Sequence, residues 1–266
     1  MKCIQAVVVT TLLSVTMLTT ASHAHAEASA EIWPVIKEGF FPKRQIEEVD
    51  FIKLSAPKRA ESGAQVPITL TIDKPQNAPD AIKSVYIIVD ANPIQLAATY
   101  HLSELLGQLQ LSTRIRLETD SFVHAIGETA DGKLYMTAIQ IRASGGCGGT
   151  LGAEEKELLA HAGKIKLNVE TPVQFNQATV TTFNINHPMF TGLQRDLVSQ
   201  GFRPALYINK ASFSYDGKPV LEADFGVGTS EDPYLRFSFI PPKPGKLEIQ
   251  ATDNEGAHFE HAIAVN

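Results

Sequence analysis

Short runs of alternating apolar and polar residues recur along almost the whole chain, and this pattern limits the folds available to it. Between residues 41 and 142, runs such as "VPITLTI" and "STRIRLE" place an apolar side chain at every second position. A period of two puts these side chains on one face of a β-strand. The more continuous run "SVYIIVD" is expected of a strand that is covered on both faces. Turn signals separate the runs, so this part of the chain is predicted to form an antiparallel β-sandwich.

A second β pattern begins at Lys164 and continues to Asn266. The runs "KIKLNVE", "TVTTFNI", "ALYINKASFSY", "YLRFSFI" and "KLEIQATD" alternate, with turn signals at "DGK" and "PPKPGK". Between the two patterns, "AEEKELLAHAG" has acidic residues in its first turn, apolar residues at helical spacing and Gly163 as a stop signal. We therefore expect an all-β chain: a sandwich over 27–142, an arm and short helix (about 153–162) within 143–163, and a second sandwich over 164–266.

The first residues are typical of a secretory signal peptide. Lys2 supplies a positive charge, an apolar run extends from Ile4 to about Leu18, and Ala24-His25-Ala26 forms a small-x-small cleavage site. The run is too short to span a membrane comfortably, and no second apolar run follows it. Residues 1–26 are thus predicted to be removed near Ala26, which leaves a periplasmic protein without a membrane segment.

The charge of the chain argues against nucleic acid as a main partner. The net charge is −6 with neutral histidines, and loss of residues 1–26 removes Lys2 but no acidic residue, which makes it −7. Nucleic-acid binding proteins instead carry basic patches that neutralise phosphates.

Cleavage would also leave a single cysteine. Cys3 lies in the signal segment, so only Cys147 remains, within "SGGCGGT" between Gly145, Gly146, Gly148 and Gly149. Glycine adopts positive and negative φ almost equally, so this sequence predicts a highly mobile arm. At about 3.3–3.6 Å per extended residue, a hairpin of this length could carry its tip roughly 15 Å from the body.

The surroundings of Cys147 in the sequence favour a carrier over a catalytic nucleophile. It has no neighbouring histidine and no second cysteine at CxxC spacing. An unassisted thiol has a pKa of about 8.5, so only a few per cent is thiolate at neutral pH. A carrier tolerates this because partner enzymes can supply the activating groups.

The sequence resembles the SoxYZ sulfur carrier family of periplasmic thiosulfate oxidation. The first half resembles SoxY through "APKRAESGAQVPITLTI", "IKSVYIIVDANPIQLAATYHL" and "LSTRIRLETDSFVHAIGETADGKLYMTAIQIRASGGCGG". The second half resembles SoxZ through "HPMFTGLQRD", "PALYINKASFSYDGKPVLEADFGVGTSEDPYLRFSF" and "ATDNEGAHF". Together the halves resemble a fused carrier of the kind associated with quinoprotein dehydrogenases.

This resemblance implies immunoglobulin-like sandwiches and a sulfur intermediate held covalently on Cys147 as an S-thiosulfonate or persulfide. It also implies separate sulfur-oxidation enzymes or a dehydrogenase system as partners, with no cofactor in the carrier. In the separate SoxY carrier the cysteine arm ends the chain, whereas here the chain continues into a second domain. A partner must therefore admit a hairpin, which leaves thiosulfate or another sulfur compound open as the load.

Two alternatives remain open from the sequence. The chain could be a thiol-dependent sulfurtransferase or hydrolase in which His161 acts as the base for Cys147. It could instead be an interaction module of a periplasmic dehydrogenase, with Cys147 forming a disulfide to a partner or to a second copy.

Other residues have simpler interpretations than a ligand site. His258 and His261 lie three apart on an expected strand, so they face opposite sides and should not share a metal. His187 and Met189 could bind copper, but "HPM" more simply predicts a turn with an inward methionine. Arg114 and Arg116 could bind an anion, but we expect them on a solvated strand face. No resident metal is therefore expected.

Overall fold

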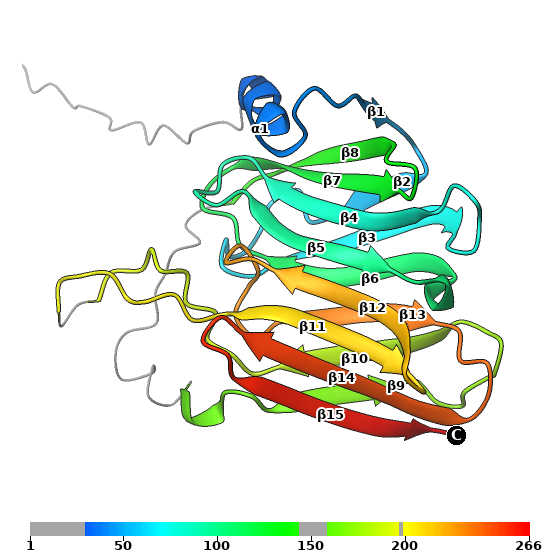
Figure 1. The fold of residues 1–266 in the computed structure, drawn as a ribbon. Coiled ribbons are helices and arrows are strands. Elements are labelled where there is room, and N and C mark those ends of the chain that lie inside the picture. The colour runs from blue at the N-terminus through cyan, green and yellow to red at the C-terminus, as the bar shows by residue number, and fades with distance from the viewer. Residues whose placement is uncertain (1–29, 144–158, 197–198) are drawn as a thin grey trace, which may run out of the picture.

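The computed structural model describes residues 30–143, 159–196 and 199–266 (Figure 1). The predicted signal segment, Cys147 and its four flanking glycines lie outside these residues. The described helices are a 3-10 helix (Ala30–Ile32), α1 (Trp33–Phe40) and a second 3-10 helix (Glu104–Leu106). The strands are β1 (Ile46–Glu48), β2 (Ile52–Ser55), β3 (Val66–Pro75), β4 (Ile82–Val89), β5 (Leu96–Leu102), β6 (Gln108–Ile115), β7 (Ser121–Thr129), β8 (Leu134–Ile141), β9 (Ile165–Val169), β10 (Thr179–Ile185), β11 (Ile208–Tyr215), β12 (Lys218–Phe225), β13 (Tyr234–Phe239), β14 (Gly245–Asp253) and β15 (His258–Val265).

These strands form two sheets. One has nine strands in the order β1-β8-β7-β4-β5-β12-β11-β14-β15, and the other has six in the order β2-β3-β6-β13-β10-β9. Among the described strands, β1 and β8 pair in parallel and the other neighbours are antiparallel. The predicted all-β fold is confirmed.

Both sheets continue from the first half of the chain into the second. In the larger sheet β5 pairs with β12, so that Leu102 lies opposite Leu221. In the smaller sheet β6 pairs with β13, so that Leu111 lies opposite Phe237. Edge strands present unpaired backbone groups, and here each half covers an edge of the other. We call these two strand pairs the junction between the halves.

One hydrophobic core fills the space between the sheets and spans the junction. Val66, Ile68, Leu70 and Ile72 of β3 are buried, as their alternation in the sequence predicts. In the second half, the ring of Phe213 lies between those of Phe183 and Phe237, each with a centroid 5.1 Å away. The packing of both halves therefore belongs to a single core.

The α1 helix covers the outer face of the nine-stranded sheet near β4 and β7. Val85, Ile87 and Val89 of β4 belong to the main core, whereas Ile88 faces the other side. There Ile88 joins a smaller cluster with Ile36 of α1. This explains why "SVYIIVD" is continuously apolar, since β4 is covered on both faces.

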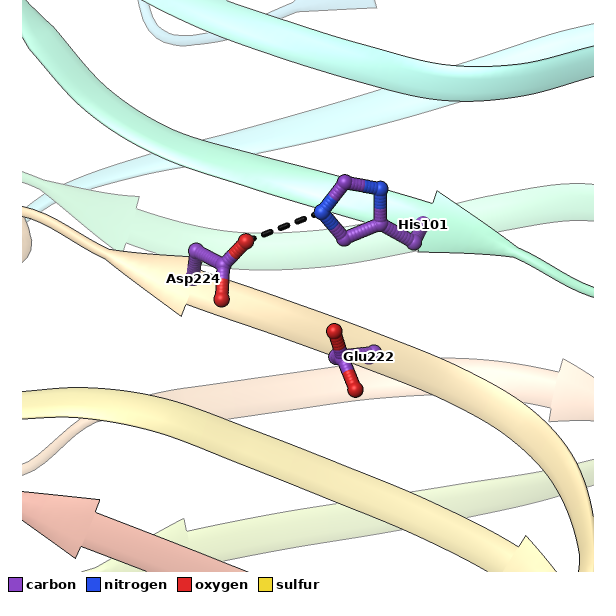
Figure 2. Close-up of side chains that lie close together, drawn as sticks. All are labelled: His101, Glu222 and Asp224. Carbon is purple, nitrogen blue, oxygen red and sulfur yellow. Dashed lines mark hydrogen bonds and ion pairs between the residues drawn. The ribbon is translucent and has the colours of Figure 1, made fainter.

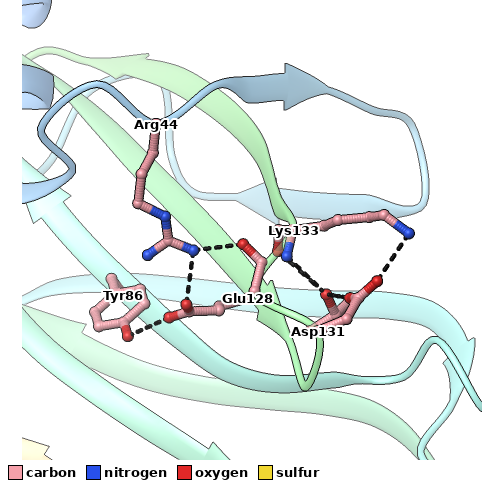
Figure 3. A network of polar contacts seen from close by, with 7 residues as sticks. Arg44, Tyr86, Glu128, Asp131 and Lys133 are labelled. Atoms are coloured by element: carbon pink, nitrogen blue, oxygen red, sulfur yellow. Dashed lines mark hydrogen bonds and ion pairs between the residues drawn. The ribbon is translucent and has the colours of Figure 1, made fainter.

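Polar contacts tie the segment after α1 to the β7–β8 hairpin (Figure 3). Arg44 Nη2 lies 2.7 Å from Glu128 Oε1, and Tyr86 Oη donates a hydrogen bond of 2.6 Å to Glu128 Oε2. Burial and this hydrogen bond raise the pKa of Tyr86 to about 12. Burial disfavours ionised Glu128, but its bonds from Tyr86 and Arg44 outweigh that effect and lower its pKa.

No helix within the described ranges is long and apolar enough to cross a membrane.

Candidate functional site

The sequence points to the arm around Cys147, and the structure describes the two anchors from which that arm leaves the sandwich. The first anchor is Ala143, two residues after the end of β8, and the second is Gly163, two residues before the start of β9. Cys147, Gly145, Gly146, Gly148 and Gly149 lie between them, outside the described residues.

Backbone hydrogen bonds fix the first anchor. The Arg142 N–H donates to the Lys58 carbonyl at 3.0 Å, and the Ala60 N–H donates to the Arg142 carbonyl at 2.8 Å. The Ala143 N–H then donates to Oδ1 of the buried Asp120 at 2.9 Å. The chain is therefore held in place up to Ala143.

The second anchor depends on the glycine that was predicted to stop a helix. Residues 159–161 are helical, and Gly163 follows with a φ of +86°. The Gly163 N–H donates to the Asn186 carbonyl at 2.8 Å. A Cβ atom on Gly163 would lie 2.5 Å from Cε1 of Phe259. The stop at Gly163 is confirmed, whereas the start of the predicted helix lies outside the described residues.

Both anchors lie at the same end of the sandwich. Successive antiparallel pairs from β8 to β11 mean that β11 begins at the end where β8 finishes. Because β10 runs into the segment before β11, and β9 is antiparallel to β10, β9 also begins there. Figure 1 shows the end of β8, the helical turn before β9 and the long loop before β11 at the left of the molecule. We call this the arm-bearing end.

Arg116 lies buried at the arm-bearing end, which corrects the expectation that Arg114 and Arg116 share a solvated face. The backbone N–H of Arg116 donates a hydrogen bond of 2.7 Å to the Gly228 carbonyl, and its side-chain Nη2 lies 3.5 Å from the Pro188 carbonyl. Arg114 instead places its guanidinium 4.9 Å from the ring centroid of Tyr234. The alternation ends with β6 at Ile115, so the two arginines point to different surroundings.

His187 and Met189 form the expected turn, with the methionine inside. Both side chains are buried, and His187 Nδ1 accepts a hydrogen bond of 3.2 Å from the Met189 N–H. The Met189 sulfur accepts one of 3.2 Å from the Ile208 N–H. Burial lowers the pKa of His187 to about 4, although Asp253 and Asp232 act in the opposite direction. These donor atoms are engaged by backbone N–H groups rather than aimed at a common point.

The other histidines singled out by the sequence are exposed. On β15, His258 lies opposite Thr252 and His261 lies opposite Ile249, which places them on opposite faces as predicted. His161 Nδ1 accepts a hydrogen bond of 3.3 Å from Lys164 Nζ. Its distance from the Cys147 thiol involves residues outside the described ranges.

Sequence reasoning missed a cluster formed by His101, Glu222 and Asp224. Their donor atoms lie within 4.8 Å of one another on the nine-stranded sheet. His101 belongs to the first half of the chain and the two acids to the second, so only the β5–β12 register brings them together. An isolated histidine and an "EAD" in two distant strands give no local signal.

Comparison with known proteins identifies both halves of the chain. Residues 37–147 match the model of the sulfur oxidation protein SoxY, and residues 166–264 match that of the sulphur oxidation protein SoxZ. No curated protein matches the sequence significantly.

Among solved structures, the sulfur carrier protein SoxY from Chlorobium limicola f thiosulfatophilum aligns with 43% of this chain and 93% of its own, at 22% identity and a TM-score of 0.36. A β-glycosidase from Bacteroides vulgatus aligns with 82% of this chain but 25% of its own, at 10% identity and a TM-score of 0.24. A glycosyl hydrolase family 2 member from Bacteroides cellulosilyticus DSM 14838 aligns with 76% of this chain and 24% of its own, at 9% identity and a TM-score of 0.23.

The two family models follow one another along the sequence, and the strands they cover share both sheets and one core. The chain therefore joins a SoxY domain and a SoxZ domain in one polypeptide and belongs to the SoxYZ sulfur carrier family.

Proposed function

We propose that this protein is a periplasmic carrier that holds a sulfur intermediate covalently on Cys147 and presents it to separate enzymes. The observation that supports the proposal is the place of Cys147 in the sequence, close to the anchored Ala143. The match to SoxY ends at Cys147, four residues after the anchored Ala143. Four extended residues span at most about 14 Å, which allows a thiol to reach beyond the surface of the sandwich.

The chemistry assigns bond formation to the thiol and oxidation to a partner. Joining the Cys147 sulfur to thiosulfate forms an S–S bond, releases one proton from the thiol and removes two electrons. The loading enzyme must therefore pass those electrons to an acceptor, and hydrolysis of the loaded group must occur in another enzyme. On this proposal the carrier has no turnover of its own.

The second anchor defines the kind of partner. Because the chain returns to the arm-bearing end at Gly163, a partner channel must admit a loop with two backbone segments rather than a free tail. We propose that the partners are periplasmic sulfur-oxidation enzymes or a quinoprotein dehydrogenase system, and such a partner would need a channel wide enough for this loop.

Intact mass of the exported protein, before and after reductant, tests the proposal. We expect a reductant-labile mass increase on Cys147 whose size distinguishes one added sulfur from a sulfonated group. Cys147→Ser should abolish the increase, and Ser144→Ala, which keeps the thiol, should retain it.

Three outcomes would contradict the carrier proposal. An adduct that persists in Cys147→Ser would place the load elsewhere. Multiple turnovers by the isolated protein would make it an enzyme. A cysteine-dependent dimer or mixed disulfide without any small adduct would indicate an interaction module.

A further inference from the structure

A histidine and two carboxylates meet on the outer face of the nine-stranded sheet, where the SoxY and SoxZ domains join (Figure 2). His101 lies on β5 and stands opposite Glu222 in the β5–β12 pair, and Asp224 follows two residues later on the same face of β12. Figure 2 shows the three side chains projecting from these two strands toward one another. We call them the junction triad.

The donor atoms of the junction triad are close and accessible. His101 Nε2 lies 2.8 Å from Asp224 Oδ2, and one donor atom from each of the three residues falls within 4.8 Å of the others. The side chains of His101 and Asp224 are 42% and 46% exposed, so an ion from solvent can reach them.

Neighbouring side chains orient the triad in the way that supports metal ligands. His101 Nδ1 lies 3.1 Å from Ser84 Oγ, which can hold the ring so that Nε2 faces the carboxylates. A ligating histidine usually has its second nitrogen bonded in this manner. Ser212 Oγ donates a hydrogen bond of 3.2 Å to Glu222 Oε2, which restrains the second carboxylate.

We propose that His101, Glu222 and Asp224 form a binding site for a divalent transition metal of the Zn²⁺ class at the junction of the two domains. Imidazole nitrogen with two carboxylate oxygens suits Zn²⁺, whereas Mg²⁺ and Ca²⁺ prefer oxygen ligands alone. When the ion binds, any proton shared by His101 Nε2 and Asp224 Oδ2 is released to solvent. Water molecules then complete the coordination of the ion. The site uses no atom of Cys147, so it stands independently of the carrier proposal.

Lys210 would compete with a bound metal ion for the carboxylate of Glu222. Its Nζ lies 2.8 Å from Glu222 Oε1, and this ion pair lowers the pKa of Glu222. A cation at the triad must share that carboxylate with the ammonium or displace it. Removal of the Lys210 charge should therefore strengthen metal binding, a result that a purely structural ion-pair network does not predict.

Zinc titration calorimetry on the exported full-length chain tests the site, with Cys147→Ser as the background so that the thiol cannot bind the metal. We expect one saturable site. His101→Ala and the near-isosteric Asp224→Asn should each weaken binding at least tenfold, and Lys210→Met should tighten it several-fold. His258→Ala removes an exposed histidine from the same sheet and should leave binding unchanged.

Urea unfolding of each variant would show that the fold is retained before its affinity is compared. Absence of saturable zinc binding in the background protein would overturn the proposal. Equal affinity in the background protein, His101→Ala and Asp224→Asn would also overturn it, because the metal would then lie elsewhere. Mg²⁺ binding with equal affinity would contradict the role given to the imidazole.

Discussion

At the scale of single residues, His187 shows how burial changes the pKa of a side chain at the arm-bearing end. Its side chain supports the turn after β10: Nδ1 accepts the Met189 N–H, while its own backbone N–H donates to Asp232 Oδ1 at 2.8 Å. Desolvation lowers its pKa to about 4 from the ordinary 6.5. The neutral form is therefore the one that the folded protein holds.

Acid should destabilise the protein through His187. Between about pH 6.5 and 4 the unfolded chain binds a proton at this residue that the folded state does not, so stability falls as the pH falls through that window. Below about pH 4 His187 is protonated in both the folded and the unfolded state, so it causes no further loss of stability. Urea unfolding at several pH values should show this fall.

His187→Asn supplies the control for that measurement. The asparagine side-chain oxygen can accept the Met189 N–H in place of Nδ1, but it does not titrate. We expect a smaller loss of stability from pH 7 to 4.5 in the variant than in the parent protein. Parallel pH profiles would show that His187 does not contribute to the dependence.

At the scale of elements, the entry into β9 depends on Gly163. An alanine there would have to adopt a φ of +86° and place its Cβ 2.5 Å from Phe259 Cε1. Gly217, in the β11–β12 turn, has a φ of +76° but nothing within 4 Å of an added Cβ. The two glycines therefore share the backbone requirement and differ in the contact.

Gly163→Ala should destabilise the protein more than Gly217→Ala does. A non-glycine residue at positive φ costs about 1–2 kcal/mol, and we expect this loss in Gly217→Ala. Gly163→Ala should lose roughly a further 1–3 kcal/mol through overpacking against Phe259. Urea unfolding of both variants measures the difference, and equal losses would mean that Phe259 moves aside at no cost.

The α1 helix is attached partly by a single aromatic contact. The rings of Trp33 and His124 stack with centroids 3.8 Å apart and an angle of 11° between planes. Beneath the tryptophan, Nε2 of the buried His124 lies 3.1 Å from Asp90 Oδ2. The contact thus covers a buried polar pair of the nine-stranded sheet.

Trp33→Ala should loosen α1 and cost about 2–4 kcal/mol of unfolding free energy, since it removes aromatic stacking and buried apolar area. Val35→Ala on the same helix is the matched control, because Val35 is 75% exposed and should change little. Because Trp33 is the chain's one tryptophan, its fluorescence in the parent protein reports directly on α1. Equal stabilities of the two variants would mean that the stacking does not hold the helix.

At the scale of the whole molecule, the two domains are held by paired strands as well as by the arm. The β5–β12 and β6–β13 pairs and the common core are non-covalent contacts that do not involve the arm. Cutting the chain after Thr150 and co-expressing residues 151–266 should therefore give a complex that co-purifies and still accepts the sulfur load. Failure of the two pieces to associate would contradict a junction of this kind.

Two phenylalanine variants, one at the junction and one at the surface, test whether the buried junction residues stabilise that association. Phe237 is buried at the junction opposite Leu111, so Phe237→Ala should cost about 3–5 kcal/mol and weaken the two-piece complex. Phe202 is 63% exposed, and Phe202→Ala should leave association unchanged. Size-exclusion chromatography of the two-piece protein distinguishes the results.

Much of the fold was readable from the sequence because side-chain alternation is local. The runs that became β3, β10 and β13 show their buried face in the order of their residues, and Gly163 shows the break before β9. The family resemblance and the glycine-flanked Cys147 were equally visible in the sequence. The role of the thiol remains a prediction.

The sequence by itself therefore determined the strand content, the order of the two domains and the presence of one cysteine, Cys147, outside the predicted signal segment. Only the tertiary structure decided that both sheets cross the junction, that Arg116 is buried, and that His101 meets Glu222 and Asp224. These features depend on which strand edges pair and in which register. Backbone pairing between distant strands depends on how all the faces pack together, and no local stretch of residues encodes it.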